Sequence, residues 1–293
     1  MQRPELRNSG LRLRQAASAP VRVIAVTGGK GGVGKTTIAV NLAAAMVDLG
    51  RRPLLFDGDL GLANVDILLG LTPRHTLAHV IRGERTLDEI LVDTGRGFSV
   101  IPGGAGVAEL ARLGEAEHAG LVRSFSSLTH DFDTLIVDTA AGISPSVLHL
   151  AAASQHVLVT VCDDAASLAD AYALVKVLSR NHGITRFHVV ASMTRRPGSG
   201  RNLFDTLERV AARFLDVRLA YAGEIPQDEA LRRAVRDQQP VVSAYPSSPS
   251  ARALKLVAAA ADTWQAPDGA SGRVEFFADR LVGSRSVRME LVQ

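Results

Sequence analysis

The stretch TGGKGGVGKTT at residues 27–37 decides how this chain folds. From Gly29 onward it satisfies the pattern G-x-x-x-x-G-K-[ST], in which glycines let successive backbone N–H groups point at phosphate oxygens. In this pattern the lysine, here Lys35, reaches the β- and γ-phosphates, and the hydroxyl of Thr36 binds Mg²⁺. The stretch therefore predicts a nucleotide phosphate site.

The residues on either side of the stretch support this interpretation. A short apolar, β-branched run at 21–26 precedes it and is typical of a buried strand. Helix-forming residues at 37–49 follow it and end at Gly50. A strand, a loop and a helix in this order place the phosphate at a helix N-terminus, where free N–H groups and the helix dipole favour an anion. The alternative, a chance glycine-rich turn, does not explain this order.

The composition sets the broad class of the protein. A chain of 293 residues that is 46% hydrophobic can hold one large α/β domain or two small ones. Cys162 is the only cysteine, which excludes an intrachain disulfide framework and any Cys-x-x-Cys metal or cluster site. No apolar run is long enough to span a bilayer and no signal peptide is evident, so we expect a cytoplasmic protein. The net charge of +3 is concentrated in residues 1–20, a basic flexible tail for which a short helix against a partner is the alternative.

Acidic residues follow two further apolar strands. The run at 53–56 leads to Asp57-Gly58-Asp59, and the run at 133–137 leads to Asp138. Ligands bind at the carboxyl ends of the strands in open α/β sheets. Carboxylates at this edge suit the water ligands of Mg²⁺ and the orientation of an attacking water, whereas an ordinary acidic loop is the alternative. Gly142, a few residues after Asp138, is expected to leave its N–H free for the γ-phosphate.

The string GGKGGVGKTT at 28–37 resembles the phosphate loop of the MinD/ParA family, also called the deviant Walker A family. The segment DGDLGLANVDILLG at 57–70 is most similar to that of the flagellar number regulators in this family. The resemblance implies an ATP-dependent homodimer with two nucleotides between the subunits. It also implies that Lys30 crosses to the partner's nucleotide, that Asp59 positions water and that Asp57 supports the metal. A solvated surface lysine is the alternative for Lys30.

The likeness covers about residues 21–265, which we expect to form a single P-loop domain. Its fold class is α/β, with a doubly wound, mostly parallel sheet and helices on both faces. Asp163 and Ala165 stand where the family's Pro-Glu-Pro segment has its two prolines, while Asp164 keeps the acid. Ser192 stands where the family places an asparagine that contacts adenine, and Pro226 belongs to the segment that packs along the base.

Together these interpretations assign three sets of residues. The residues assigned to the nucleotide are Gly31, Gly32, Val33, Gly34, Lys35, Thr36, Thr37, Gly142, Ser192 and Pro226. The residues assigned to Mg²⁺ are Thr36, Asp57 and Asp138. The residues assigned to catalysis of slow, partner-stimulated ATP hydrolysis are Lys30, Lys35 and Asp59.

The resemblance also implies a role in flagellar number or placement. The partners it implies are a flagellar signal-recognition-type GTPase and a transcription activator. The N-terminal tail has Arg14-Gln15-Ala16-Ala17 rather than the family's Asp-Gln-Ala-x-x-Leu-Arg motif, which weakens the inference to the GTPase. The alternatives are a partition ATPase that binds DNA nonspecifically and a division-site ATPase that acts at the membrane. Nucleic acid is not the expected partner.

Residues 266–293 form a linker and a last segment. Val274, Phe277 and Leu281 recur at helical spacing, which predicts a short amphipathic helix that ends at Gly283. The resemblance implies a reversible contact of this segment with the inner face of the cell membrane. The alternative is that the segment docks on its own domain.

Overall fold

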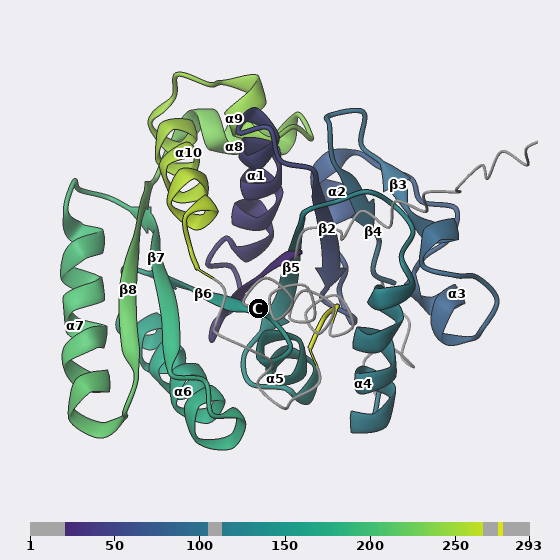
Figure 1. Cartoon of the computed structure of the whole chain (residues 1–293). Coiled ribbons are helices and arrows are strands. Elements are labelled where there is room, and N and C mark those ends of the chain that lie inside the picture. The colour runs from purple at the N-terminus through teal and green to yellow at the C-terminus, as the bar shows by residue number, and fades with distance from the viewer. Residues whose placement is uncertain (1–20, 105–112, 266–274, 278–293) are drawn as a thin grey trace, which may run out of the picture.

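The computed structural model of the chain describes residues 21–104, 113–265 and 275–277. The basic tail at 1–20 and the greater part of the segment 266–293 lie outside the described residues. Strands and helices alternate along the described chain and assemble into a sheet with the order β3-β4-β2-β5-β1-β6-β7-β8 (Figure 1). All pairs are parallel except β3 with β4. The predicted doubly wound α/β fold is confirmed.

The elements have the following bounds. The strands are β1 Arg22–Gly28, β2 Pro53–Gly58, β3 Val92–Asp93, β4 Ser99–Ile101, β5 Thr134–Ala141, β6 His156–Cys162, β7 Arg186–Thr194 and β8 Arg218–Pro226. The helices are α1 Lys35–Asp48, α2 Val65–Leu69, α3 Leu77–Ile81, α4 Glu115–Ser124, α5 Pro145–Ala152, α6 Ala165–His182, α7 Ser199–Phe214, α8 Glu229–Arg236, α9 Val241–Ala244 and α10 Pro249–Asp262. The described residues also include the 3₁₀ turns Asp88–Ile90 and Phe125–Ser127.

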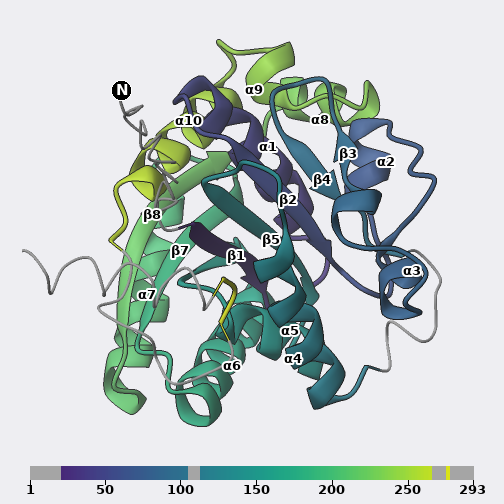
Figure 2. The ribbon, with the colours of Figure 1, turned by 45° about the vertical axis from the view of Figure 1, so that its right-hand side comes forward.

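Helices cover both faces of the sheet. In Figure 1 α1, α8, α9 and α10 lie above it and α4, α5 and α6 below it, and the turned view in Figure 2 shows the same two layers. Strand β1 shows why its sequence is continuously apolar: Val23 and Ala25 face one core, whereas Ile24 and Val26 face the other. A parallel sheet that is buried on both faces requires such runs.

The strand Arg218–Pro226 was not among the predicted elements. It is the edge strand β8, and it pairs with β7 from Arg186 to Thr194. Its residues are mostly half-buried or exposed, so it lacks the apolar run that identified the central strands. The two-residue β3 at the opposite edge is too short for any periodicity to reveal it.

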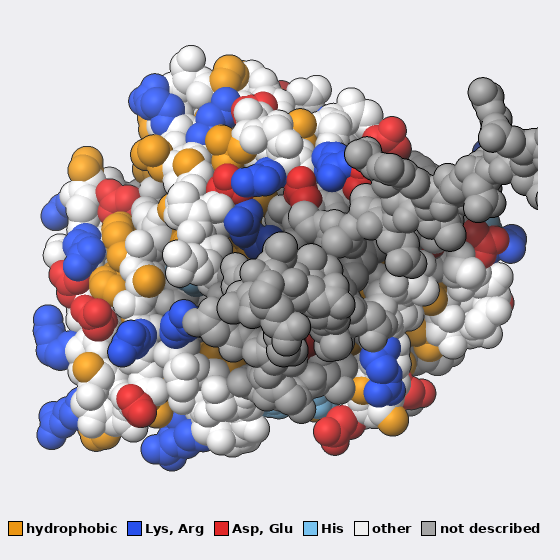
Figure 3. Space-filling view, in the orientation of Figure 1, with side chains coloured by type: hydrophobic (Ala, Val, Ile, Leu, Met, Phe, Trp, Pro, Cys, Tyr) orange, Lys and Arg blue, Asp and Glu red, His pale blue; other side chains and the backbone are white. Residues whose placement is uncertain are grey.

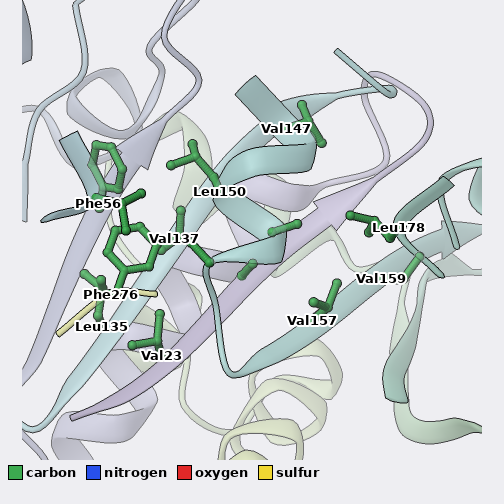
Figure 4. Close-up of a cluster of buried hydrophobic side chains, with 14 of the residues drawn as sticks. Val23, Phe56, Leu135, Val137, Val147, Leu150, Val157, Val159, Leu178 and Phe276 are labelled. Carbon is green, nitrogen blue, oxygen red and sulfur yellow. The ribbon is translucent and has the colours of Figure 1, made fainter. Parts of the chain in front are cut away.

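Two aromatic residues near the C-terminus complete one core. Phe276 and Phe277 are each 1% exposed, and the N–H of Phe276 donates to the carbonyl of Ala153 at 3.3 Å. The Phe276 ring meets that of Phe125 edge-on at 4.9 Å between centroids, and Figure 4 shows it among the buried side chains of β2 and β5. Phe277 has a φ of 57°, which a right-handed helix does not allow, so the predicted helix does not run through this residue. For these two residues, docking on the chain's own domain is confirmed.

We expect the Phe276→Ala variant to lose about 3–5 kcal/mol of unfolding free energy, because it deletes a large, fully buried side chain. The matched control is Phe214→Ala, whose ring is 57% exposed and whose loss should cost less than about 1 kcal/mol. Urea unfolding followed by circular dichroism measures both. Equal losses in the two variants would mean that the Phe276 side chain is not docked.

At the amino-terminal edge of the sheet, the buried His156 and the half-buried His188 lie beside the single tryptophan. The rings of His188 and Trp264 stack with 3.5 Å between centroids, and His156 packs against the same indole at 5.5 Å. Burial lowers the pKa of His156 to about 4, and burial likewise lowers the pKa of His188 to about 4. Both imidazoles are therefore neutral in the folded protein above pH 5.

The lowered pKa values of the two histidines predict that the folded protein becomes less stable as the pH decreases. In the unfolded chain the pKa of histidine is about 6.5, so below this pH the unfolded chain binds protons that the folded chain does not bind. The free energy of unfolding therefore decreases as the pH falls toward 4. Between pH 7 and pH 5 we expect His156 alone to account for a loss of about 2 kcal/mol. Urea titrations read by the fluorescence of Trp264 measure it, and a His156→Gln variant should lack that part of the pH dependence. If the free energy of unfolding of this variant depends on pH as steeply as that of wild type, the lowered pKa of His156 is not the cause.

Candidate functional site

The glycine-rich loop joins β1 to α1 at the carboxyl edge of the sheet. Gly34 has a φ of 94° and immediately precedes α1, a conformation that favours glycine. Gly29 lies so close to α6 that a Cβ built on it would come within 2.3 Å of the Asp170 backbone. The loop therefore requires glycine both for its turn into the helix and for its contact with α6.

Lys35 lies across this loop. Its side chain is largely buried, and Nζ donates a hydrogen bond to the backbone carbonyl of Lys30 at 3.2 Å. Burial lowers the pKa of Lys35, while Asp138 and Asp59 act in the opposite direction. A buried ammonium with one neutral acceptor is well placed to receive an anion.

Asp138 is the most unusual acid of the site. It is 1% exposed and lies within β5, which continues past it to Ala141, and neither carboxylate oxygen has a hydrogen-bond partner. Burial, followed by the nearby Asp57, raises the pKa of Asp138 well above its usual range, although Thr36 and Lys35 lie near enough to lower it. An unpartnered carboxylate beside a hydroxyl offers the hard oxygen donors that Mg²⁺ prefers.

These residues fit a metal that arrives with a nucleotide. Within the described residues no group of three or more His, Cys, Asp or Glu side chains forms a cation site by itself. Protein-bound Mg²⁺ commonly uses one or two protein ligands, with water and substrate phosphates completing its shell. Asp138 and Thr36 match that arrangement.

Asp57 organises the loop that follows β2. Its Oδ2 accepts the N–H groups of Asn64 at 2.9 Å and Val65 at 3.0 Å, and Oδ1 accepts that of Asp59 at 3.2 Å. Burial raises the pKa of Asp57 to about 7, against the effect of these N–H donors. The carboxylate thereby closes the segment 57–65 and holds the N-terminus of α2. Its contact with a metal remains a prediction.

Asp59 lies within the segment that Asp57 closes. Its side chain is half-buried, and its Oδ1 accepts the N–H of Leu62 at 3.0 Å. Asp57 and Asp138 pair in register across β2 and β5, and Asp59, which follows β2, lies near enough to Asp138 to raise the pKa of that carboxyl. This is the arrangement in which we predict it to orient water.

Lys30 forms an ion pair within its own chain. Its Nζ lies 3.1 Å and 3.0 Å from the two carboxylate oxygens of Asp164. Asp164 begins α6, and hydrogen bonds from the Ser167 N–H, the Cys162 thiol and Lys30 lower its pKa to about 2. Asp164 was singled out in the sequence as a retained acid, but nothing in the sequence indicated that it pairs with Lys30. A reach of Lys30 to a second subunit remains a prediction.

The backbone N–H of Gly142 was predicted to be free for the γ-phosphate. This N–H is not free but donates to the carbonyl of Gly28 at 3.0 Å. The cause is the pairing of β1 with β5, which continues to Gly28 and Ala141 through a register shift and so engages the next N–H. In this structure the expected γ-phosphate donor is therefore part of the sheet edge.

The residues expected to meet the base lie on β7 and β8. Ser192 is 4% exposed, and its Oγ is 3.1 Å from where a Cβ on Gly34 would lie. The next residue, Met193, has a φ of 56° and is 39% exposed, at a shift in register between β7 and β8. Pro226 pairs with Thr194 and ends β8. Ser192 thus packs under the phosphate loop, and the sequence did not indicate that Met193 would be the exposed residue here.

The structure brings the predicted residues to one edge of the sheet. The loop after β1 contains Gly31, Gly32, Val33 and Gly34, and the first turn of α1 contains Thr36 and Thr37. Asp57 lies near the end of β2, Asp59 directly after that strand, and Asp138 within β5. On the other side of β1, beyond β6, Ser192 lies near the end of β7 and Pro226 ends β8. No described helix is long and apolar enough to cross a membrane.

Comparison with known proteins agrees with this geometry. Residues 24–241 match the model of the CobQ/CobB/MinD/ParA nucleotide binding domain. The chain is 52% identical over 263 residues to the antiactivator FleN of Pseudomonas aeruginosa, covering 90% of this chain and 94% of that protein. It is 33% identical over 219 residues to the flagellum site-determining protein YlxH of Helicobacter pylori, covering 74% of each.

A solved structure supports the fold. The septum site-determining protein MinD of Pyrococcus horikoshii, in complex with Mg-ADP, superposes with a TM-score of 0.69 at 23% identity, covering 83% of this chain and 96% of that one. At this identity the likeness shows the fold alone.

Proposed function

Because the chain belongs to the family of CobQ/CobB/MinD/ParA nucleotide-binding domains, we propose that it is an ATPase switch that controls the number or placement of flagella. The likeness to the antiactivator FleN carries this proposal, since it spans nearly the whole of both chains. The likeness to a flagellum site-determining protein supports the flagellar setting. The name antiactivator supports a transcription activator as one partner, and a flagellar signal-recognition-type GTPase is the second.

The site supports a division of roles. Lys35 and the N–H groups of residues 31–37 hold the β- and γ-phosphates at the N-terminus of α1. Asp138 and Thr36 hold the metal, and Asp59 orients the attacking water. When Mg-ATP is bound, ATP would supply the phosphoryl group, and Mg²⁺ would supply positive charge that offsets the negative charge of the phosphates. Catalysis by these residues is positioning and electrostatic stabilisation.

Dimerisation would complete the site. Lys30 leaves the carboxylate of Asp164 and reaches the nucleotide of a second copy, so that the ATP-bound state is the dimer and hydrolysis ends it. Equilibrium sedimentation with ATP, with ADP and without nucleotide tests this, in wild type and in Asp59→Ala. A dimer that forms equally in all three conditions would contradict the switch.

Two alternative functions, DNA partition and action at a membrane, can each be tested separately. On the face in Figure 3 the Lys and Arg side chains are interspersed with Asp and Glu, which does not favour nonspecific DNA binding there. ATP-dependent DNA retention that falls steeply with salt would instead favour a partition ATPase. Sedimentation with anionic liposomes, with and without residues 278–293, tests a peripheral membrane contact.

The deciding experiment is the number of flagella per cell. A strain that carries Lys35→Ala at the native locus is compared with wild type and with Lys255→Ala by electron microscopy. Lys255 is half-exposed and pairs with Asp48 away from the loop, so its variant should resemble wild type. Extra or misplaced flagella in the Lys35 variant alone would support the proposal. Normal flagella with minicells or lost replicons would assign the ATPase to division or partition.

A further inference from the structure

Gln238 occupies a backbone position that usually belongs to glycine. At the end of α8 the N–H of Gln238 donates to the carbonyl of Val235 at 3.2 Å, and that of Gln239 to Ala234 at 2.9 Å. Gln238 has a φ of 56°. Helices often end on glycine in this left-handed conformation, because a side chain is disfavoured there. A glutamine at this position therefore suggests that its side chain makes a contact that glycine could not make.

That side chain caps the C-terminal end of α2. Its Nε2 donates to the carbonyl of Ile67 at 3.0 Å. Gly70 ends α2 beneath the same side chain, and a Cβ built on Gly70 would come within 2.8 Å of Oε1 of Gln238. The last turn of α2 and the glutamine amide are thus closely fitted to each other.

The connection between α8 and α9 is itself anchored. The N–H of Val242, on α9, donates to Oδ1 of Asn41 on α1 at 3.2 Å. The guanidinium of Arg96 lies 3.5 Å from the carbonyl of Gln238. Gln238 therefore extends from a segment that is fixed to the helix that follows the phosphate loop.

Helix α2 is in this way held at both ends. Asp57 accepts the N–H groups of Asn64 and Val65 at its N-terminus, and Gln238 donates to Ile67 near its C-terminus. Asp59 lies in the loop that leads into this helix. A displacement of α2 would move the residues that follow Asp59 and change the direction of its carboxylate.

We propose that Gln238 is a positioning residue for hydrolysis: through α2 it fixes the loop that carries Asp59. This inference rests on the proposed ATPase function and deepens it. Gln238 does not line the phosphate loop, so its loss affects the turnover of bound ATP rather than the binding of ATP.

Steady-state hydrolysis by full-length variants tests the inference. Gln238→Met keeps the length of the side chain but removes the donor, and Gln238→Gly removes the donor while relieving the backbone. Gln238→Lys restores a donor, and the neighbouring exposed residue gives the control Gln239→Met. We expect kcat to fall about fivefold in the methionine and glycine variants, with KM for ATP within twofold of wild type and partial recovery in the lysine variant. Hydrogen exchange at the α2 amides should accelerate in both the methionine and the glycine variants of Gln238, and not in the Gln239→Met control.

The outcomes separate the two claims. Wild-type protein that hydrolyses no ATP, alone or as a dimer, would overturn the proposed function. Active wild type with unchanged kcat in both Gln238→Met and Gln238→Gly would overturn only the positioning role. A glycine variant with wild-type kcat beside a slow methionine variant would attribute the effect to backbone strain and would also overturn it.

Discussion

Replacing Lys35 by alanine is expected to lower ATP turnover at least about 100-fold and to weaken Mg-ATP binding severely. The ammonium is largely buried, and it donates to the carbonyl of Lys30 at 3.2 Å. Burial lowers the pKa of Lys35, and a triphosphate beside it would raise the pKa again. Alanine removes the charge that neutralises the β- and γ-phosphates and leaves the loop N–H groups alone to hold them. Isothermal titration with ATP and continuous phosphate release measure the two effects.

The control for this prediction is Lys255→Ala. Lys255 pairs with Asp48 at 2.9 Å and lies outside the loop, so both binding and turnover should stay within about twofold of wild type. Tight ATP binding by the Lys35 variant would show that the loop does not bind phosphate through this lysine.

Replacing Asp138 by asparagine is expected to produce two effects of opposite sign. Without nucleotide the protein should become more stable, because a buried carboxylate with no hydrogen-bond partner is replaced by a neutral amide. We expect the thermal midpoint to rise by roughly 3 °C or more. With Mg²⁺ and ATP the variant should gain little further stability, because the donor that holds the metal is absent. Thermal scans with ATP, with and without Mg²⁺, measure both effects.

The control here is Asp131→Asn, which removes a surface carboxylate that is 78% exposed. It should change the midpoint by about 1 °C at most and keep the full stabilisation by Mg-ATP. An Asp138 variant that is less stable than wild type without ligand would mean that the carboxylate has a stabilising partner.

The central part of the fold could be predicted from local sequence. Strands β1, β2, β5, β6 and β7 are buried on both faces, and their apolar runs follow directly from that. The acids Asp57 and Asp138 could be placed together because each follows an apolar run and neighbouring parallel strands bring such positions to one edge, although β5 continues past Asp138 to Ala141. The phosphate loop was recognisable because its glycines, Lys35 and Thr36 follow a fixed local spacing, although Gly29 is also needed for the contact with Asp170 of α6.

The remaining features depend on contacts between distant residues. The ion pair of Lys30 with Asp164, and the docking of Phe276 on Phe125, join residues that no local pattern relates. The N–H of Gly142 is engaged because β1 and β5 pair beyond their register shift. Strand β8 has no apolar run because it lies at the sheet edge. In each case tertiary packing, rather than local preference, decided the outcome.

The closed segment 57–65 has a consequence for the timing of the switch. Ordering a flexible backbone costs roughly 1–2 kcal/mol of conformational entropy per residue. Because the chain's own backbone supplies the N–H groups of Asp59, Asn64 and Val65 that bind Asp57, we expect this cost to belong to folding and not to be repeated at each ATP encounter. The nucleotide then meets a preorganised loop. The lifetime of the bound state is accordingly expected to depend on how a partner displaces this loop, and little on how quickly the loop orders itself.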